Sequence, residues 1–124
     1  MRRRALLVGL AIVGLGIAGG AARAGDFMAL ATRSLRGDAA RFGWSSLRVG
    51  FRVQFPAAVS GRTFLSRKYD VLDALERVLE RTRYDPSGGV PERERLGRLV
   101  ADTVRRAAPS GTVSRVSDIW IEAR

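Results

Sequence analysis

Strict alternation of apolar and polar residues marks one segment of the chain as a β-strand. Between residues 47 and 55 every second side chain is apolar, and polar residues or glycine stand between them. Successive side chains of a strand point to opposite faces, so the apolar set would line a core. Arg48 and Arg52 would then both stand on the other face. We therefore expect a half-buried strand that ends at Pro56 and carries two arginines on its polar face.

Two later segments have apolar residues at three- and four-residue intervals, which is typical of amphipathic helices. The first runs from residue 64 or 66 to 83, with Glu76 on its polar side, and a loop or turn is expected over residues 57–63. The second begins near Pro91 and stops before the breaker at 108–111. The predicted core stripe of the first helix comprises Leu65, Tyr69, Val71, Leu72, Leu75, Val78 and Leu79.

A second strand is predicted over residues 112–122, because apolar and β-branched residues return there. Its phase is irregular, since the step from Val116 to Ile119 moves the apolar set to the other face. An extra residue in a strand has this effect, so we expect a β-bulge near Ser117-Asp118. The bulge would leave Trp120 on the face opposite Ile119 and Ile121.

The order strand, helix, helix, strand predicts a small α+β domain over residues 45–124, with two helices packed on a mostly antiparallel sheet. Two strands alone are marginally stable, so we expect a further strand in 42–44, in 57–64, or from a neighbouring subunit. Residues 25–44, interrupted by Gly37-Asp38, are expected to form a linker or a short helix. An exposed sheet edge is a natural assembly point, which makes a homo-oligomer one expected partnership.

The first 24 residues have the three parts of an export signal. Arg2, Arg3 and Arg4 precede an apolar run over 5–22, and Ala22 and Ala24 are the small residues of a cleavage site after position 24. Two outcomes stay open: cleavage, which frees a periplasmic domain, or retention of 5–22 as an inner-membrane anchor. About 18 residues at ~1.5 Å each would reach ~27 Å, close to the ~30 Å hydrocarbon thickness. In both cases the N-terminal arginines stay cytoplasmic and the remainder faces the periplasm.

The amino-acid composition limits the reactions and the ligands that the protein can support. The chain has no histidine and no cysteine, which removes the commonest general base, the usual metal ligand and the thiol nucleophile. We therefore expect no enzyme activity, no catalytic residues, and no cofactor-binding or metal site. The formal net charge is +10, and loss of the four arginines in residues 1–24 would lower it to +6. A basic domain favours anionic partners, membrane headgroups among them, but export and the lack of a binding motif argue against nucleic acid.

Three stretches of sequence resemble one known family, the flagellar basal-body-associated FliL family. They are Tyr69-Asp70-Val71-Leu72-Asp73-Ala74-Leu75, Leu96-Gly97-Arg98-Leu99-Val100, and Val113-Ser114-Arg115-Val116-Ser117-Asp118-Ile119-Trp120-Ile121. The likeness spans about residues 45–122. It implies a single N-terminal membrane segment and a periplasmic domain, similar to stomatin-type domains, that assembles around the motor stator. The implied role is a non-enzymatic one in motility, with protein partners in the cell envelope.

A second hypothesis stays open beside the resemblance. The protein could be a free periplasmic adaptor that binds an anionic partner through its arginine-bearing strand face. In either case the candidate interaction residues are Arg48, Arg52 and Trp120.

Overall fold

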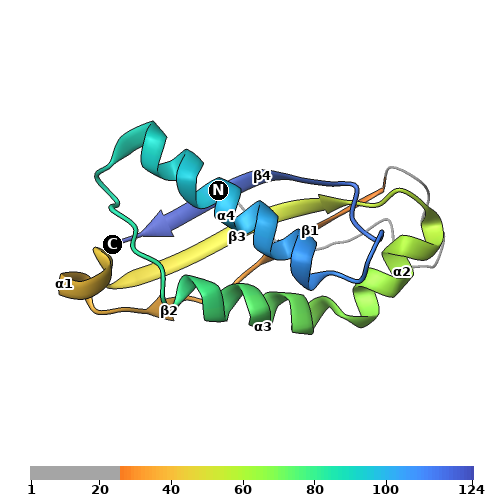
Figure 1. Cartoon of the computed structure of the whole chain (residues 1–124), viewed down its shortest axis with the longest axis horizontal. Coiled ribbons are helices and arrows are strands. Elements are labelled where there is room, and N and C mark those ends of the chain that lie inside the picture. Colours follow the sequence, from red (N-terminus) through yellow and green to blue (C-terminus); the bar gives the residue numbers. More distant parts are fainter. Residues whose placement is uncertain (1–25) are drawn as a thin grey trace.

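The computed structural model describes residues 26–124, which form an α+β domain (Figure 1). The export residues Arg2, Arg3, Arg4, Ala22 and Ala24 lie outside the described residues. The elements follow in the order β1 (Phe27–Ala31), β2 (Leu35–Arg36), α1 (Ala39–Phe42), β3 (Ser46–Gln54), α2 (Ala58–Ser66), α3 (Lys68–Leu79), α4 (Gly89–Ala107) and β4 (Arg115–Ala123).

The long alternating strand, β3, is the centre of an antiparallel four-stranded sheet. Strands β1 and β2 both pair with one side of β3, and β4 pairs with the other side. Thr32 lies between β1 and β2 and keeps the chain on the sheet, since its backbone N–H donates to the Val49 carbonyl at 2.8 Å and its hydroxyl accepts from the Val49 N–H at 3.1 Å. The predicted strand is confirmed, and it holds the sheet together because it contacts all the others.

The expected bulge in the last strand is confirmed. Gly50 of β3 pairs with Trp120, whereas Arg52 pairs with Ser117, so β4 carries one extra residue between these two pairs. Asp118 supplies it with a left-handed φ of 51°, a conformation that aspartate tolerates better than most residues. Ile119 and Ile121 pack against the core and Trp120 lies on the opposite face, as the phase change predicted.

The described part of the expected linker, residues 26–44, contributes strands and buried residues to the domain, which corrects the expectation from sequence. These residues contain β1, β2 and α1, and Leu30, Leu35 and Trp44 are buried in the core. The indole N–H of Trp44 donates to the Thr82 carbonyl at 2.8 Å. The third strand therefore lies in neither 42–44 nor 57–64. The strand is β1, whose alternation of apolar residues is short and ends at Thr32. Pairing with the long central strand β3 stabilises β1 although its own sequence pattern is weak.

The helical region after β3 also differs from the expectation. Residues 58–66 form α2 instead of a loop, and the single helix expected to run to residue 83 is divided at Arg67 into α2 and α3. The change of direction at Arg67 resets the helical phase. Phe64 consequently enters the core, whereas Leu65 and Tyr69, expected in the core stripe, are exposed.

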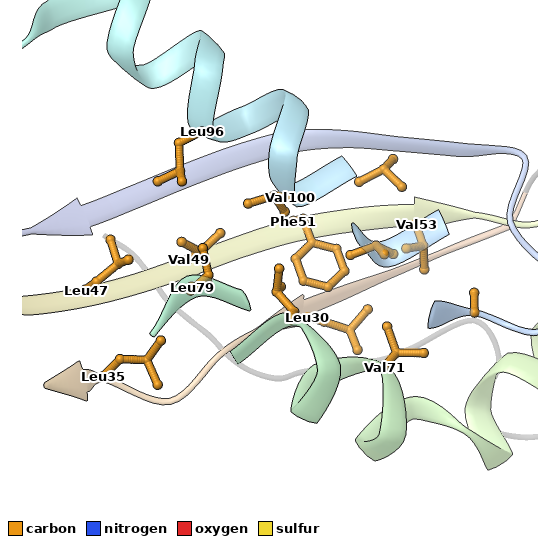
Figure 2. Close-up of a cluster of buried hydrophobic side chains, with 14 of the residues drawn as sticks. Leu30, Leu35, Leu47, Val49, Phe51, Val53, Val71, Leu79, Leu96 and Val100 are labelled. Atoms are coloured by element: carbon orange, nitrogen blue, oxygen red, sulfur yellow. The ribbon is translucent and has the colours of Figure 1, made fainter. Parts of the chain in front are cut away.

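The core fills the space between one face of the sheet and the helices α3 and α4, which lie on that same face (Figure 1). Figure 2 shows the apolar side chains of β1, β2 and β3 pointing toward those of the two helices. The residues labelled there are Leu30, Leu35, Leu47, Val49, Phe51, Val53, Val71, Leu79, Leu96 and Val100.

One charged residue, Glu76 of α3, is buried although its position predicted the exposed side of the helix. Its carboxylate accepts hydrogen bonds from the Arg33 backbone N–H at 3.1 Å and from the Arg33 Nε at 2.9 Å. Charge-assisted bonds of this kind are among the stronger ones in proteins. They attach the connection between β1 and β2 to α3 and so fix the edge of the sheet against the helical layer.

Candidate interaction surface

Within residues 26–124, the helices α3 and α4 cover one face of the sheet and no helix covers the other. Arg48, Arg52 and Trp120, the three candidate interaction residues, all lie on this second face, where the structure brings them together. We call it the open sheet face. It comprises Phe27, Ala29, Arg48, Gly50, Arg52, Asp118, Trp120 and Glu122.

Trp120 lies directly on Gly50, its partner across the β3–β4 pair. A Cβ atom built on Gly50 would be 2.0 Å from Cε2 of the indole, so the ring occupies the space that any other side chain would need. The Arg48 guanidinium lies 5.2 Å from the centre of the same ring, within cation–π range. Trp120 is nevertheless 40% exposed, and a large aromatic side chain is thus held in a fixed position at the surface.

A second aromatic residue, Phe27 of β1, extends this surface at the other side of β3. It is 48% exposed, and the Arg52 guanidinium lies 4.0 Å from its ring centre. Sequence reasoning missed Phe27 because it falls in the segment expected to be a linker. The usable signal was the short apolar series Phe27, Met28 and Leu30 just before the breaker residues.

Both arginines of the open sheet face have acidic partners within that face. Arg52 Nη1 lies 3.2 Å from Asp118 Oδ2, and Arg48 Nη1 lies 3.8 Å from Glu122 Oε1. All four side chains are substantially exposed, so each pair contributes at most ~1 kcal/mol to stability. The pairs mainly hold the guanidinium groups over the aromatic rings and balance their charge locally.

A groove of about 530 Å³ runs between the first half of α4 and the strand β4. Its lining is mostly apolar, and a Cβ atom built on Gly97 of α4 would lie 3.9 Å from Cδ1 of Ile119, an ordinary contact distance. Trp120 contributes to this groove as well as to the open sheet face. The lining residues are Val90, Arg93, Glu94, Gly97, Ile119, Trp120 and Ile121.

Two acidic side chains, Asp85 and Glu92, accept hydrogen bonds at the beginning of α4. The Glu92 carboxylate accepts from the Asp85 backbone N–H at 3.2 Å and from Arg95 Nε. The hydrogen bond from Arg95 lowers the pKa of Glu92, and bonds from Ser87 lower the pKa of Asp85. These bonds fix the turn that precedes α4, whereas the N-cap residue Gly88 makes no side-chain hydrogen bond to the helix. Two carboxylates beside the helix N-terminus disfavour the binding of an anion there.

Comparisons with protein-family models, with curated proteins and with solved structures found no match to this chain. Across residues 26–124, no helix is both long and apolar enough to cross a bilayer. The same part of the chain holds no group of three or more acidic side chains placed to bind a metal ion. The open sheet face and the neighbouring groove are therefore the features of the molecule that point to a function.

Proposed function

We propose that this protein is a non-enzymatic assembly protein of the cell envelope that binds a protein partner through the open sheet face. The observation that carries the proposal is the clustering of Phe27 and Trp120 with two arginines on the face that the helices of the domain leave uncovered. Tryptophan and arginine are enriched among residues that dominate binding energy at protein interfaces. Both aromatic rings are held in place before binding, which lowers the entropy cost of association.

The arrangement of charges favours a protein over a purely anionic partner. Arg48 and Arg52 already face Glu122 and Asp118, so an anion would have to compete with a carboxylate at each site. A protein surface can instead cover the aromatic rings and exchange hydrogen bonds with both signs of charge. The free adaptor for an anionic ligand is therefore the second hypothesis, favoured by the net basic charge of the chain.

The cellular location and the partner that we propose follow from the resemblance to the FliL family. An export or anchor segment before residue 25 would place the domain in the periplasm, where the flagellar stator would be the first partner to test. Two helices on one face of an antiparallel sheet support the comparison at the level of architecture only. Under this proposal, deletion of the gene reduces swimming, and normal motility would contradict the flagellar role without touching the binding surface.

The binding surface is tested directly by photo-crosslinking in cells that produce the full-length chain. A photo-reactive phenylalanine analogue at position 27 should crosslink to one envelope protein, and the same analogue at Tyr69 is the matched control. Tyr69 is 72% exposed but lies on α3, away from the open sheet face. Equal crosslinking from both positions, or none from position 27, would refute the proposal.

Variants and salt then separate the two hypotheses. The double variant Arg48→Ala/Arg52→Ala should abolish the crosslink from position 27, because it removes the groups that stack on both rings. For a protein partner, binding should persist at high salt, since buried aromatic contacts are not screened. Binding that disappears as salt rises to about 1 M would favour the anionic ligand, because the screening length is then only ~3 Å.

A further inference from the structure

The strand β4 has a free edge. In the described part of the chain it pairs with β3 alone, so its other side presents unpaired backbone groups. Such an edge is a template for another strand unless something blunts it. The apolar groove along α4 runs beside the same strand and leaves side-chain space next to the edge.

The hydrogen bonds of β4 show which residues address this edge. Arg124 and Ser46 exchange backbone hydrogen bonds of 3.0 and 3.2 Å, so the backbone N–H and C=O of Arg124 point toward β3. Hydrogen-bonded and non-hydrogen-bonded pairs alternate along an antiparallel ladder. Ala123, Ile121 and Ile119 therefore direct their N–H and C=O groups outward, to the free side.

The bulge limits how much of this edge can pair. The left-handed Asp118 interrupts β4 at one end, and the strand ends at Ala123. The regular free edge is thus the segment 119–123, whose middle residue is Ile121. An antiparallel copy of the same segment would place Ile121 opposite itself and form up to about six hydrogen bonds.

The charges at the ends of the segment favour this register. With Ile121 at the centre, Asp118 comes opposite Arg124 of the partner subunit, just beyond the regular segment, although its carboxylate also lies 3.2 Å from Arg52 of its own copy. The two-fold symmetry repeats this attraction between opposite charges. A register centred on Trp120 would instead bring Asp118 opposite Glu122 of the partner subunit, two like charges. On the helical side, Ile119 and Ile121 of both copies would meet beside the groove that Val90 and Gly97 line.

We propose that a second copy of this chain binds the free edge of β4 in antiparallel fashion, centred on Ile121. The two sheets would join into one, with α4 of each copy on the same side. The open sheet faces would also become continuous across the junction, giving a partner two adjacent copies of the same binding surface. The dimer uses the edge of β4 and the proposed function uses the open sheet face, so each can be tested without the other.

The absence of cysteine from the chain allows a sharp test. In the full-length protein, Ile121→Cys introduces a single thiol that the proposed register places about 5.5 Å, Cα to Cα, from its symmetry mate, within disulfide range. Mild oxidation should give a disulfide-linked dimer. Trp120→Cys tests the competing register, and Val59→Cys, on the exposed surface of α2, measures random collision. Sedimentation of the unmodified protein should show a dimer at about 100 µM.

A charge variant tests the same register without a thiol. Arg124→Asp places two like charges opposite each other at both ends of the segment and should weaken the dimer about tenfold at low salt. Arg115→Asp is the matched control on the same strand, beyond the bulge, and should leave the dimer intact.

Four results would overturn the proposal. They are a monomer at about 100 µM, crosslinking through position 59 as efficient as through position 121, preferential crosslinking through position 120, and exclusive capture of a different protein by the thiol at position 121. The last result would show that the edge accepts a foreign strand in place of a second copy.

Discussion

The contact between Trp120 and Gly50 gives the most direct test of how the open sheet face is built. Gly50 does not have a positive φ, so its backbone conformation does not require glycine. The obstacle to a side chain is the indole, which lies 2.0 to 2.2 Å from the position of an added Cβ. Gly50→Ala must therefore displace the Trp120 ring by about 1.5 Å to restore ordinary contact distances.

The expected magnitude combines two opposing effects. Overpacking at a well-fitted contact costs about 1–3 kcal/mol. Replacing glycine by alanine where the backbone permits it stabilises the folded protein by about 0.4–1 kcal/mol, because the unfolded chain then has fewer conformations. We expect Gly50→Ala to destabilise the protein by about 1–2 kcal/mol net.

The assay is a double-mutant cycle with Trp120→Ala, measured by urea unfolding and followed by far-UV circular dichroism. Trp120→Ala removes the three atoms that lie closest to the new methyl group, so Gly50→Ala in this background should be neutral or stabilising by up to about 1 kcal/mol. The change of sign is the diagnostic result. An equal loss of stability in both backgrounds would show that the ring does not occupy the space above Gly50, and our account of the surface would be wrong.

Two further predictions concern the scaffold. Glu76→Ala should cost about 1–2 kcal/mol in urea unfolding, because the Arg33 backbone N–H loses its buried acceptor, whereas the largely exposed guanidinium is rehydrated by water. Glu80→Ala is the matched control, since that exposed carboxylate lies 3.7 Å from Arg33 and should contribute under ~1 kcal/mol. If both variants lose the same stability, the attachment of the sheet edge is not specific to Glu76. For Glu92→Gln, the pKa of Glu92 is lowered by its bond from Arg95, so the stabilisation is present above the ordinary carboxyl pKa and disappears as pH falls through the lowered value. The difference in urea midpoint between wild type and Glu92→Gln should shrink between about pH 7 and about pH 3, and a constant difference would contradict this assignment.

Local pattern was sufficient for the two longest strands, β3 and β4. The alternation over residues 47–55 predicted β3 and placed Arg48 and Arg52 on a common face, because a strand has a fixed two-residue period. The phase change before Ile119 predicted the bulge and the side on which Trp120 lies. In each case the decisive information lies within about ten residues of sequence, so no distant contact had to be known.

Contacts between distant segments could not be predicted in this way. Phe27 and its strand gain their place by pairing with β3, and the burial of Glu76 depends on Arg33, 43 residues earlier in the chain. The burial of Trp44 likewise depends on a carbonyl 38 residues later. A segment that is too short to show a period of its own is ordered by the longer strand beside it, and that partner is not visible in the local pattern.

The sequence by itself determined which side chains of β3 and β4 share a face, because the two-residue period and the bulge are properties of the local chain. The tertiary structure alone decided what that face contains. Within residues 26–124, packing of α3 and α4 on one side left the other side without a helix, and pairing of β1 and β4 with β3 brought Phe27 and Trp120 to the same arginine-bearing surface. The physical reason is that burial and pairing depend on which distant segments meet, whereas the direction of a side chain depends only on its neighbours in the chain.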